Sequence, residues 1–272
     1  MDAFLSFFEN MPTWQRLIWL TLILGGFWIL EGYYALVRFK YNKWIHARTN
    51  FILLAFVLLV NLLFGFLTAG IFIWLDESGF GLLHLFSLPI WLELLLSILV
   101  LDLIAQYFVH YLLHKVKWMW RLHLIHHTDT HVDATTGTRH HPLDFILRES
   151  FALIAVLIMG MPVAYYLFYR LLSIFFTYFT HANISIPNSL DKALSYVIVT
   201  PNMHKFHHHY QLPWTDSNYG NMFSIWDHMF GTYVYENTAN IRYGIDIVKD
   251  DKADNIGYQL GIPFNRKIKT KN

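Results

Sequence analysis

Residues 99–114 read LVLDLIAQYFVHYLLH, and this stretch places polar side chains at regular intervals inside an apolar run. Asp102, Gln106, His110 and His114 recur every fourth residue, so a helix would carry them along one slowly drifting stripe with Leu, Ile and Val on its other faces. Polar groups are costly inside a membrane. We therefore expect the stripe to face the protein interior with both histidines as metal ligands. The alternative is an interfacial pair bonded to headgroups or water.

The sequence around this stretch predicts an integral membrane protein. The chain is 55% hydrophobic and only 14% charged, which is unusual for a soluble domain. Apolar stretches long enough to cross about 30 Å of hydrocarbon cover residues 14–37, 51–75 and 88–113. Glu31 lies within the first of them and needs a partner or an interfacial position. Residues 1–12 lack the basic region and cleavage site of a secretory signal, so we expect the first stretch to remain as an anchor.

Two further apolar segments, 145–159 and 163–178, predict a helical hairpin hinged at Gly160 and Pro162. Each arm is marginal in length for a full crossing, so the hairpin can enter and leave on one side. Basic residues follow the first and third stretches, which places both connectors in the cytoplasm; they are Arg38, Lys40, Lys43, Arg48, Lys115, Lys117 and Arg121. We expect an all-α membrane bundle of about four to five embedded helices, with a cytoplasmic helical cap holding a histidine-bound dimetal site.

Histidines are concentrated in the second half of the chain. Fourteen of the 16 lie between residues 110 and 228. The spacing at 123, 126 and 127 recurs at 204, 207 and 208, and adjacent residues on a helix diverge by about 100°. One member of each adjacent pair can therefore face each of two metals. Four ligands close a structural zinc site, so eight or nine histidines imply two metals. The chain has no cysteine, which excludes disulfides, thiolate zinc sites and cysteine-bound iron–sulfur clusters within it.

Several of these segments together resemble the fatty acid hydroxylase and sterol desaturase superfamily. They are HYLLH (110–114), HLIHH (123–127), RHHPL (139–143), HAN (181–183), PNMHKFHH (201–208) and the closing residues NYG (218–220), WD (226–227) and FGT (230–232). The resemblance covers about half of the chain in the family's order. It implies eight histidine ligands, with a ninth in HAN and a weaker tenth in RHHPL: His110, His114, His123, His126, His127, His204, His207 and His208, then His181, then His141.

The resemblance also implies a function. Members are membrane enzymes with a histidine-bound pair of iron ions that use O2 and two external electrons to hydroxylate or desaturate an unactivated lipid carbon. Sterols, fatty acyl chains and ether lipids are candidate substrates, and Zn²⁺ can replace iron on purification. We expect a separate ferredoxin, small cytochrome or flavoprotein reductase as electron donor. The implied organisation is N-terminal membrane spans over 1–87, a catalytic domain over 88–240 and a C-terminal tail over 241–272.

Other polar residues have two interpretations. Asp102, Asn183, Asn218 and Asp227 can accept hydrogen bonds from ligand rings and orient them, although Asn218 can equally shape a turn. His131, His140 and His228 are expected to be hydrogen-bonding or surface residues, and His209 to face away from its neighbours.

Two other functions are compatible with the histidines. A membrane hydrolase with two zinc ions would attack a lipid ester or headgroup with metal-bound water. A metal carrier would place its ligands near the midplane in broken spans, whereas these histidines cluster at one edge. No basic face suits a nucleic acid.

Overall fold

The computed structural model describes residues 2–211, 214–236, 238 and 241–270, and helices are the regular elements of this part of the chain. Three long elements come first: α2 (Thr13–Tyr33), α3 (Lys43–Ser78) and a third built from α4 (Ile90–Asp102), η2 (Leu103–Phe108) and α5 (Val109–Lys115). The short helices α1 (Asp2–Glu9) and η1 (Leu82–Leu85) flank them. The all-helical prediction is confirmed.

The second half forms a hairpin and a cap. The hairpin is α7 (Pro142–Met159) and α8 (Val163–His181), joined at Gly160, as predicted. The cap consists of α6 (Lys117–His127), η3 (Ala134–Thr138), α9 (Asn188–Leu194), α10 (Pro201–His207), η4 (Trp214–Asp216), α11 (Ile225–Phe230), η5 (Asp250–Lys252), α12 (Ile256–Gly261) and η6 (Ile262–Phe264).

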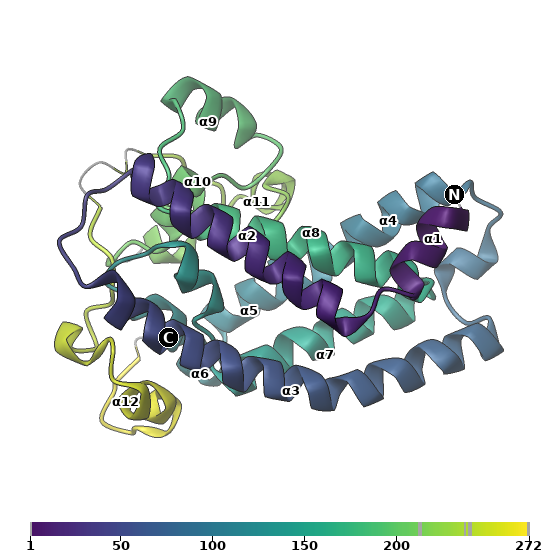
Figure 1. The fold of residues 1–272 in the computed structure, drawn as a ribbon, viewed down its shortest axis with the longest axis horizontal. Helices are drawn as coiled ribbons and strands as arrows, with labels where there is room; N and C mark the ends of the chain where they lie inside the picture. The colour runs from purple at the N-terminus through teal and green to yellow at the C-terminus, as the bar shows by residue number, and fades with distance from the viewer. Residues whose placement is uncertain (1, 212–213, 237, 239–240, 271–272) are drawn as a thin grey trace.

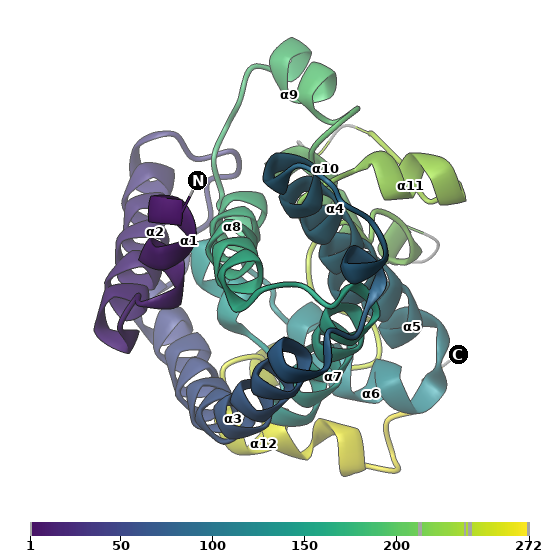
Figure 2. The ribbon, with the colours of Figure 1, turned by 90° about the vertical axis from the view of Figure 1, so that its right-hand side faces the viewer.

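The long helices run lengthwise, and the cap gathers at one end (Figure 1). Seen along the length, α8 lies inside the bundle, with α2 on one side and α4 on the other (Figure 2). Residues 13–33, 43–85 and 90–115 are long and apolar enough to cross a membrane. The protein is therefore an integral membrane protein by the character of its helices. The helix of the second span, α3, is longer than the apolar stretch 51–75 that predicted it. It has 36 residues and so measures about 54 Å.

The third span differs from the regular α-helix that its spacing predicts. Its middle segment, Leu103–Phe108, is a π-helix. The i→i+5 hydrogen bonds of a π-turn place more residues in each turn, which brings residues four apart closer to alignment than an α-helix does. On the stripe, Asp102, His110 and His114 are buried, and Gln106 is partly buried.

Buried polar contacts connect the spans to the cap. Glu31, inside α2, accepts hydrogen bonds from the backbone N–H groups of Ala134 (2.9 Å) and Asn183 (3.0 Å) and pairs with Lys43 (2.8 Å). Asp102 accepts from the backbone N–H of Phe223 (3.1 Å) and the indole of Trp226 (2.9 Å). The two carboxylates thus hold cap segments against α2 and α4.

The described part of the predicted C-terminal tail is folded against the cap. Ile245, Val248, Ile262 and Ile268 pack with α6 and α3 in one apolar cluster. The guanidinium of Arg121 donates to the carbonyl oxygens of Pro263 (2.8 Å), Asn265 (2.6 Å) and Ile268 (2.9 Å). Residues 241–270 therefore belong to the body of the protein.

Candidate metal centre

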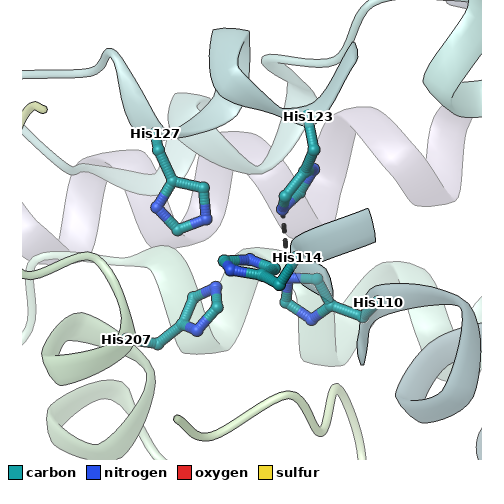
Figure 3. A group of neighbouring side chains, drawn as sticks. All are labelled: His110, His114, His123, His127 and His207. Atoms are coloured by element: carbon teal, nitrogen blue, oxygen red, sulfur yellow. Dashed lines mark hydrogen bonds between the residues drawn. The ribbon is translucent and has the colours of Figure 1, made fainter. Parts of the chain in front are cut away.

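Five histidines converge from three helices into a first group. They are His110 and His114 on α5, His123 and His127 on α6, and His207 on α10, and all are buried. One ring nitrogen from each lies within 4.8 Å of the others. Figure 3 shows the five rings pointing toward a common centre. A cluster of this size can surround one metal ion.

Four more histidines form a second group beside the first. They are His126, His181, His204 and His208, again buried and with one nitrogen each within 4.8 Å of the others. The Nε2 atom of His181 lies 3.1 Å from that of His126 and 2.9 Å from that of His204. The two groups adjoin, because the rings of His127 and His208 stack with centroids 4.8 Å apart.

The adjacent histidines divide between the groups as the helical period predicts. His126 and His127 diverge, and so do His207 and His208, with interplanar angles of 89° in both pairs. Each pair contributes one ring to each group. The histidine motifs at 123–127 and 204–208 therefore contribute to both groups in the same way.

The arrangement of the ring nitrogens suits metal binding better than hydrogen bonding between the rings. His110 directs Nδ1 at the carbonyl of Tyr219 (2.9 Å), and His181 directs Nδ1 at that of Thr177 (2.6 Å). A carbonyl only accepts, so each Nδ1 carries the proton and each neutral ring presents a bare Nε2. The same holds for His207, whose Nδ1 faces the Ser217 carbonyl (2.6 Å) and whose buried Nε2 has no hydrogen-bond partner in the structure. Nε2 of His110 lies 3.1 Å from Nε2 of His123, whose Nδ1 faces a carboxylate oxygen of Asp144 (3.3 Å), so both Nε2 atoms are bare and repel each other. A shared cation removes this conflict.

Protonation of the histidines does not replace that cation. Burial, reinforced by neighbouring imidazoles, lowers the pKa of His126, His127, His204 and His208 well below the ordinary value. Burial lowers the pKa of His207 to about 4. The rings are therefore neutral at physiological pH, which is the state that binds a metal. An all-imidazole set suits iron, zinc, copper or nickel.

Two carboxylates lie behind rings of the first group, and no motif in the sequence pointed to either of them. Asp216 Oδ1 lies 3.3 Å from Nδ1 of His114, and Asp144 Oδ2 lies 3.3 Å from Nδ1 of His123. Asp144 also bonds His140 (2.9 Å), whose ring stacks on His126 with centroids 4.7 Å apart. A carboxylate behind a ligating imidazole fixes its tautomer and orientation.

The residues predicted to orient the rings bond to other groups instead. Asp102 binds the cap, as described above, and Asn183 exchanges hydrogen bonds with the backbone of Val37. Asn218, in the left-handed region at φ 55°, bonds the backbone of Met203 and Val234. Asp227 accepts from the N–H groups of Tyr219 and Gly220. Asp227 acts on the site indirectly, because it holds the Tyr219–Gly220 peptide, whose carbonyl accepts from Nδ1 of His110.

The remaining histidines lie outside both groups. His141 accepts a hydrogen bond from the backbone of Leu143 at the start of α7 and packs on Phe264, so the structure does not bring it to the other nine. His131 stacks on Tyr41, and His228 stacks on Tyr233. His209 accepts from the N–H of Gln211. His131, His209 and His228 therefore make ring contacts or hydrogen bonds outside both groups, whereas His141, expected as a weaker tenth ligand, caps the start of α7.

Comparison with known proteins identifies the family. Residues 94–232, about half of the chain, match the model of the fatty acid hydroxylase family. The chain belongs to this family. The matched segment contains every histidine of both groups.

Curated relatives are lipid enzymes by name. Identity is 26% to ornithine lipid hydroxylase OlsE of Rhizobium tropici, over 66% of this chain and 52% of that protein. It is 27% to alkylglycerol monooxygenase of Homo sapiens, over 66% of this chain and 38% of that protein. The very-long-chain aldehyde decarbonylase GL1-9 of Oryza sativa is 29% identical over 56% of this chain and 58% of that protein. The chain thus matches between about two fifths and three fifths of these relatives' lengths. No solved structure matches it.

Proposed function

We propose that this protein is a membrane oxidoreductase that uses O2 and two external electrons to hydroxylate or desaturate an unactivated C–H bond of a lipid. The observation that carries the proposal is the pair of adjoining, buried groups built entirely from histidine, at the end of a bundle of membrane spans. Family membership and the names of the hydroxylase and monooxygenase relatives support it. The lipid is a sterol, a fatty acyl chain or an ether lipid.

Two iron ions are the cofactor in this proposal. His110, His114, His123, His127 and His207 would hold one ion, and His126, His181, His204 and His208 the other. When bound, the iron pair supplies the activation of O2 and the two-electron oxidation of the substrate. The site faces the cytoplasm, because Lys and Arg follow the first and third spans. A ferredoxin, small cytochrome or flavoprotein reductase delivers the electrons.

The chain's own residues orient the ligands and exclude water. The carbonyls of Tyr219, Thr177 and Ser217 hold the protons of three rings on Nδ1, which leaves Nε2 for the metal. All nine rings are buried, so the centre is shielded from solvent, as chemistry on reactive oxygen requires.

One variant from each group tests the proposal. Protein made in iron-replete cells should contain two iron ions per chain, and ¹⁸O from labelled O2 should enter a lipid product that lipidomics finds only in the complemented deletion strain. His126→Ala and His207→Ala should each lower the iron content and abolish the product. His84→Ala, which alters an exposed histidine on η1, is the matched control.

The outcome also separates the rival functions. Iron and product unchanged in both variants would refute the proposal. Turnover that proceeds without O2 and releases a headgroup or fatty acid would indicate the zinc hydrolase. Metal flux into proteoliposomes would indicate a carrier.

A further inference from the structure

A basic pocket lies where the C-terminal segment packs on α6, separate from the histidine groups. Its volume is about 780 Å³, and it opens to the surface. The lining includes Lys117, Arg121, Phe264, Arg266, Lys269 and Thr270. None of the nine clustered histidines lines it, so its chemistry is independent of the metal centre.

The charge of this pocket is positive and uncompensated. Residues 115–128 and 255–270 contain no Asp or Glu, and no carboxylate lines the pocket among the described residues. The hydrogen bonds of Arg121 go to backbone carbonyls, so its charge is not paired with a carboxylate. Lys117, Arg266 and Lys269 are exposed. Four cations around one cavity favour an anion with several oxygen atoms, such as a phosphate.

An unpartnered hydroxyl gives independent evidence for a ligand. Thr270 lines the pocket and is 7% exposed, yet its Oγ1 has no hydrogen-bond partner in the structure. A buried hydroxyl without a partner is unfavourable. A phosphate oxygen in the pocket would accept its proton.

The position of the pocket indicates a lipid as the source of the phosphate. Lys117 lies two residues beyond Lys115, the last residue of the third span. The neighbouring Trp118 is 57% exposed, and Phe264 in the lining is 67% exposed. Exposed aromatic rings at the end of a span are typical of the membrane interface, where lipid headgroups lie.

We propose that this pocket binds the headgroup phosphate of an anionic phospholipid. The cations of Lys117, Arg121, Arg266 and Lys269 attract the phosphate, and Thr270 donates a hydrogen bond to it. Phe264 and Trp118 contact the acyl region beside the headgroup. The bound lipid attaches the C-terminal segment to the bilayer at the level of α6.

Native mass spectrometry of the full-length protein tests this with phosphatidylglycerol and phosphatidylcholine. Wild type should retain phosphatidylglycerol over phosphatidylcholine. Arg266→Gln/Lys269→Gln should weaken phosphatidylglycerol retention roughly 30-fold, since each interfacial cation contributes about a factor of five. Thr270→Val, which removes the hydroxyl at nearly constant shape, should weaken it about tenfold. Lys192→Gln/Lys249→Gln removes the same charge from exposed positions elsewhere and should change nothing.

Each other result overturns the proposal. Equal retention in all variants would show that the pocket is not the lipid site, and equal losses in the two double variants would show a general charge effect. Inorganic phosphate that binds alone and displaces the lipid at millimolar concentration would show a soluble anion site. Thermal unfolding identifies any variant that fails to fold, and Thr270→Val then decides the question by itself.

Discussion

At the scale of single residues, the adjacent pairs His126/His127 and His207/His208 each place one ring in each of the two histidine groups. The histidine spacing in 123–127 and 204–208 is a property of one helix, so the division of the adjacent pairs between two groups could be anticipated. Asp144 and Asp216 have no comparable signal. Asp216 is 102 residues away from His114 in the sequence, and nothing in the spacing relates the two. Asp102 and Asn218 were instead selected for their motifs, and the structure gives them backbone contacts.

Removing the carboxylate behind His114 should weaken metal binding. Asp216→Ala deletes the group 3.3 Å from Nδ1 of His114, and loss of such an orienting partner lowers metal affinity about tenfold. A chelator competition titration measures the change. Asp216 also pairs with Lys115 at 2.7 Å, so Lys115→Met serves as the control that breaks this ion pair alone. Wild-type affinity in Asp216→Ala would exclude the orienting role.

At the scale of elements, hydropathy predicts where the apolar helices lie. The π-helical segment of the third span depends instead on contacts with other elements. The apolar stretches and the hairpin lie where they were predicted, because lipid-facing and core-facing helices must both be apolar. The π segment was not predictable. Its flanks are fixed by distant partners, with Asp102 bonded to the cap and His110 bonded to Tyr219. A sequence pattern does not contain these partners.

Glu31 should contribute to the stability of the folded protein, although it lies within the first span. Glu31→Ala would leave Lys43 and the N–H groups of Ala134 and Asn183 without their buried acceptor. A buried N–H group left without its acceptor costs about 1 to 3 kcal/mol, and two such groups are left here. Thermal unfolding in micelles should show this loss, with weaker metal retention at His181, two residues before Asn183. Glu9→Ala, exposed on α1, is the control, and equal stability of the two variants would contradict the role of Glu31.

At the scale of the whole molecule, the sequence predicted a membrane bundle with a polar cap but not how the chain closes around the site. The C-terminal residues 241–270 are polar enough to suggest a tail, yet Arg121 and the isoleucines of this segment hold it on α6. These contacts join residues about 140 positions apart, beyond the reach of any periodicity. The C-terminal segment therefore packs on α6, the helix that carries three of the nine clustered histidines.

The buried imidazoles should make the metal-free protein sensitive to mild acid. The folded-state pKa values of His126, His127, His204 and His208 lie well below 6.5, and that of His207 is about 4. Unfolded histidines take up protons near pH 6.5 while the folded ones do not, so stability is present above pH 6.5 and is lost as the pH falls toward 4. Each histidine contributes a slope of about 1.4 kcal/mol per pH unit. Asp227, whose pKa burial raises to about 6, and Asp191, whose pKa burial also raises, have the opposite effect, but the buried histidines outnumber them. Thermal unfolding between pH 7.5 and 4.5 should therefore show falling stability after chelation and a smaller fall with metal bound, because the metal holds the rings neutral.

His207→Gln should reduce the slope by one proton, whereas His84→Ala, at an exposed position, should leave it unchanged. Stability that stays constant or rises below pH 6.5 would show that these rings are not buried as neutral bases.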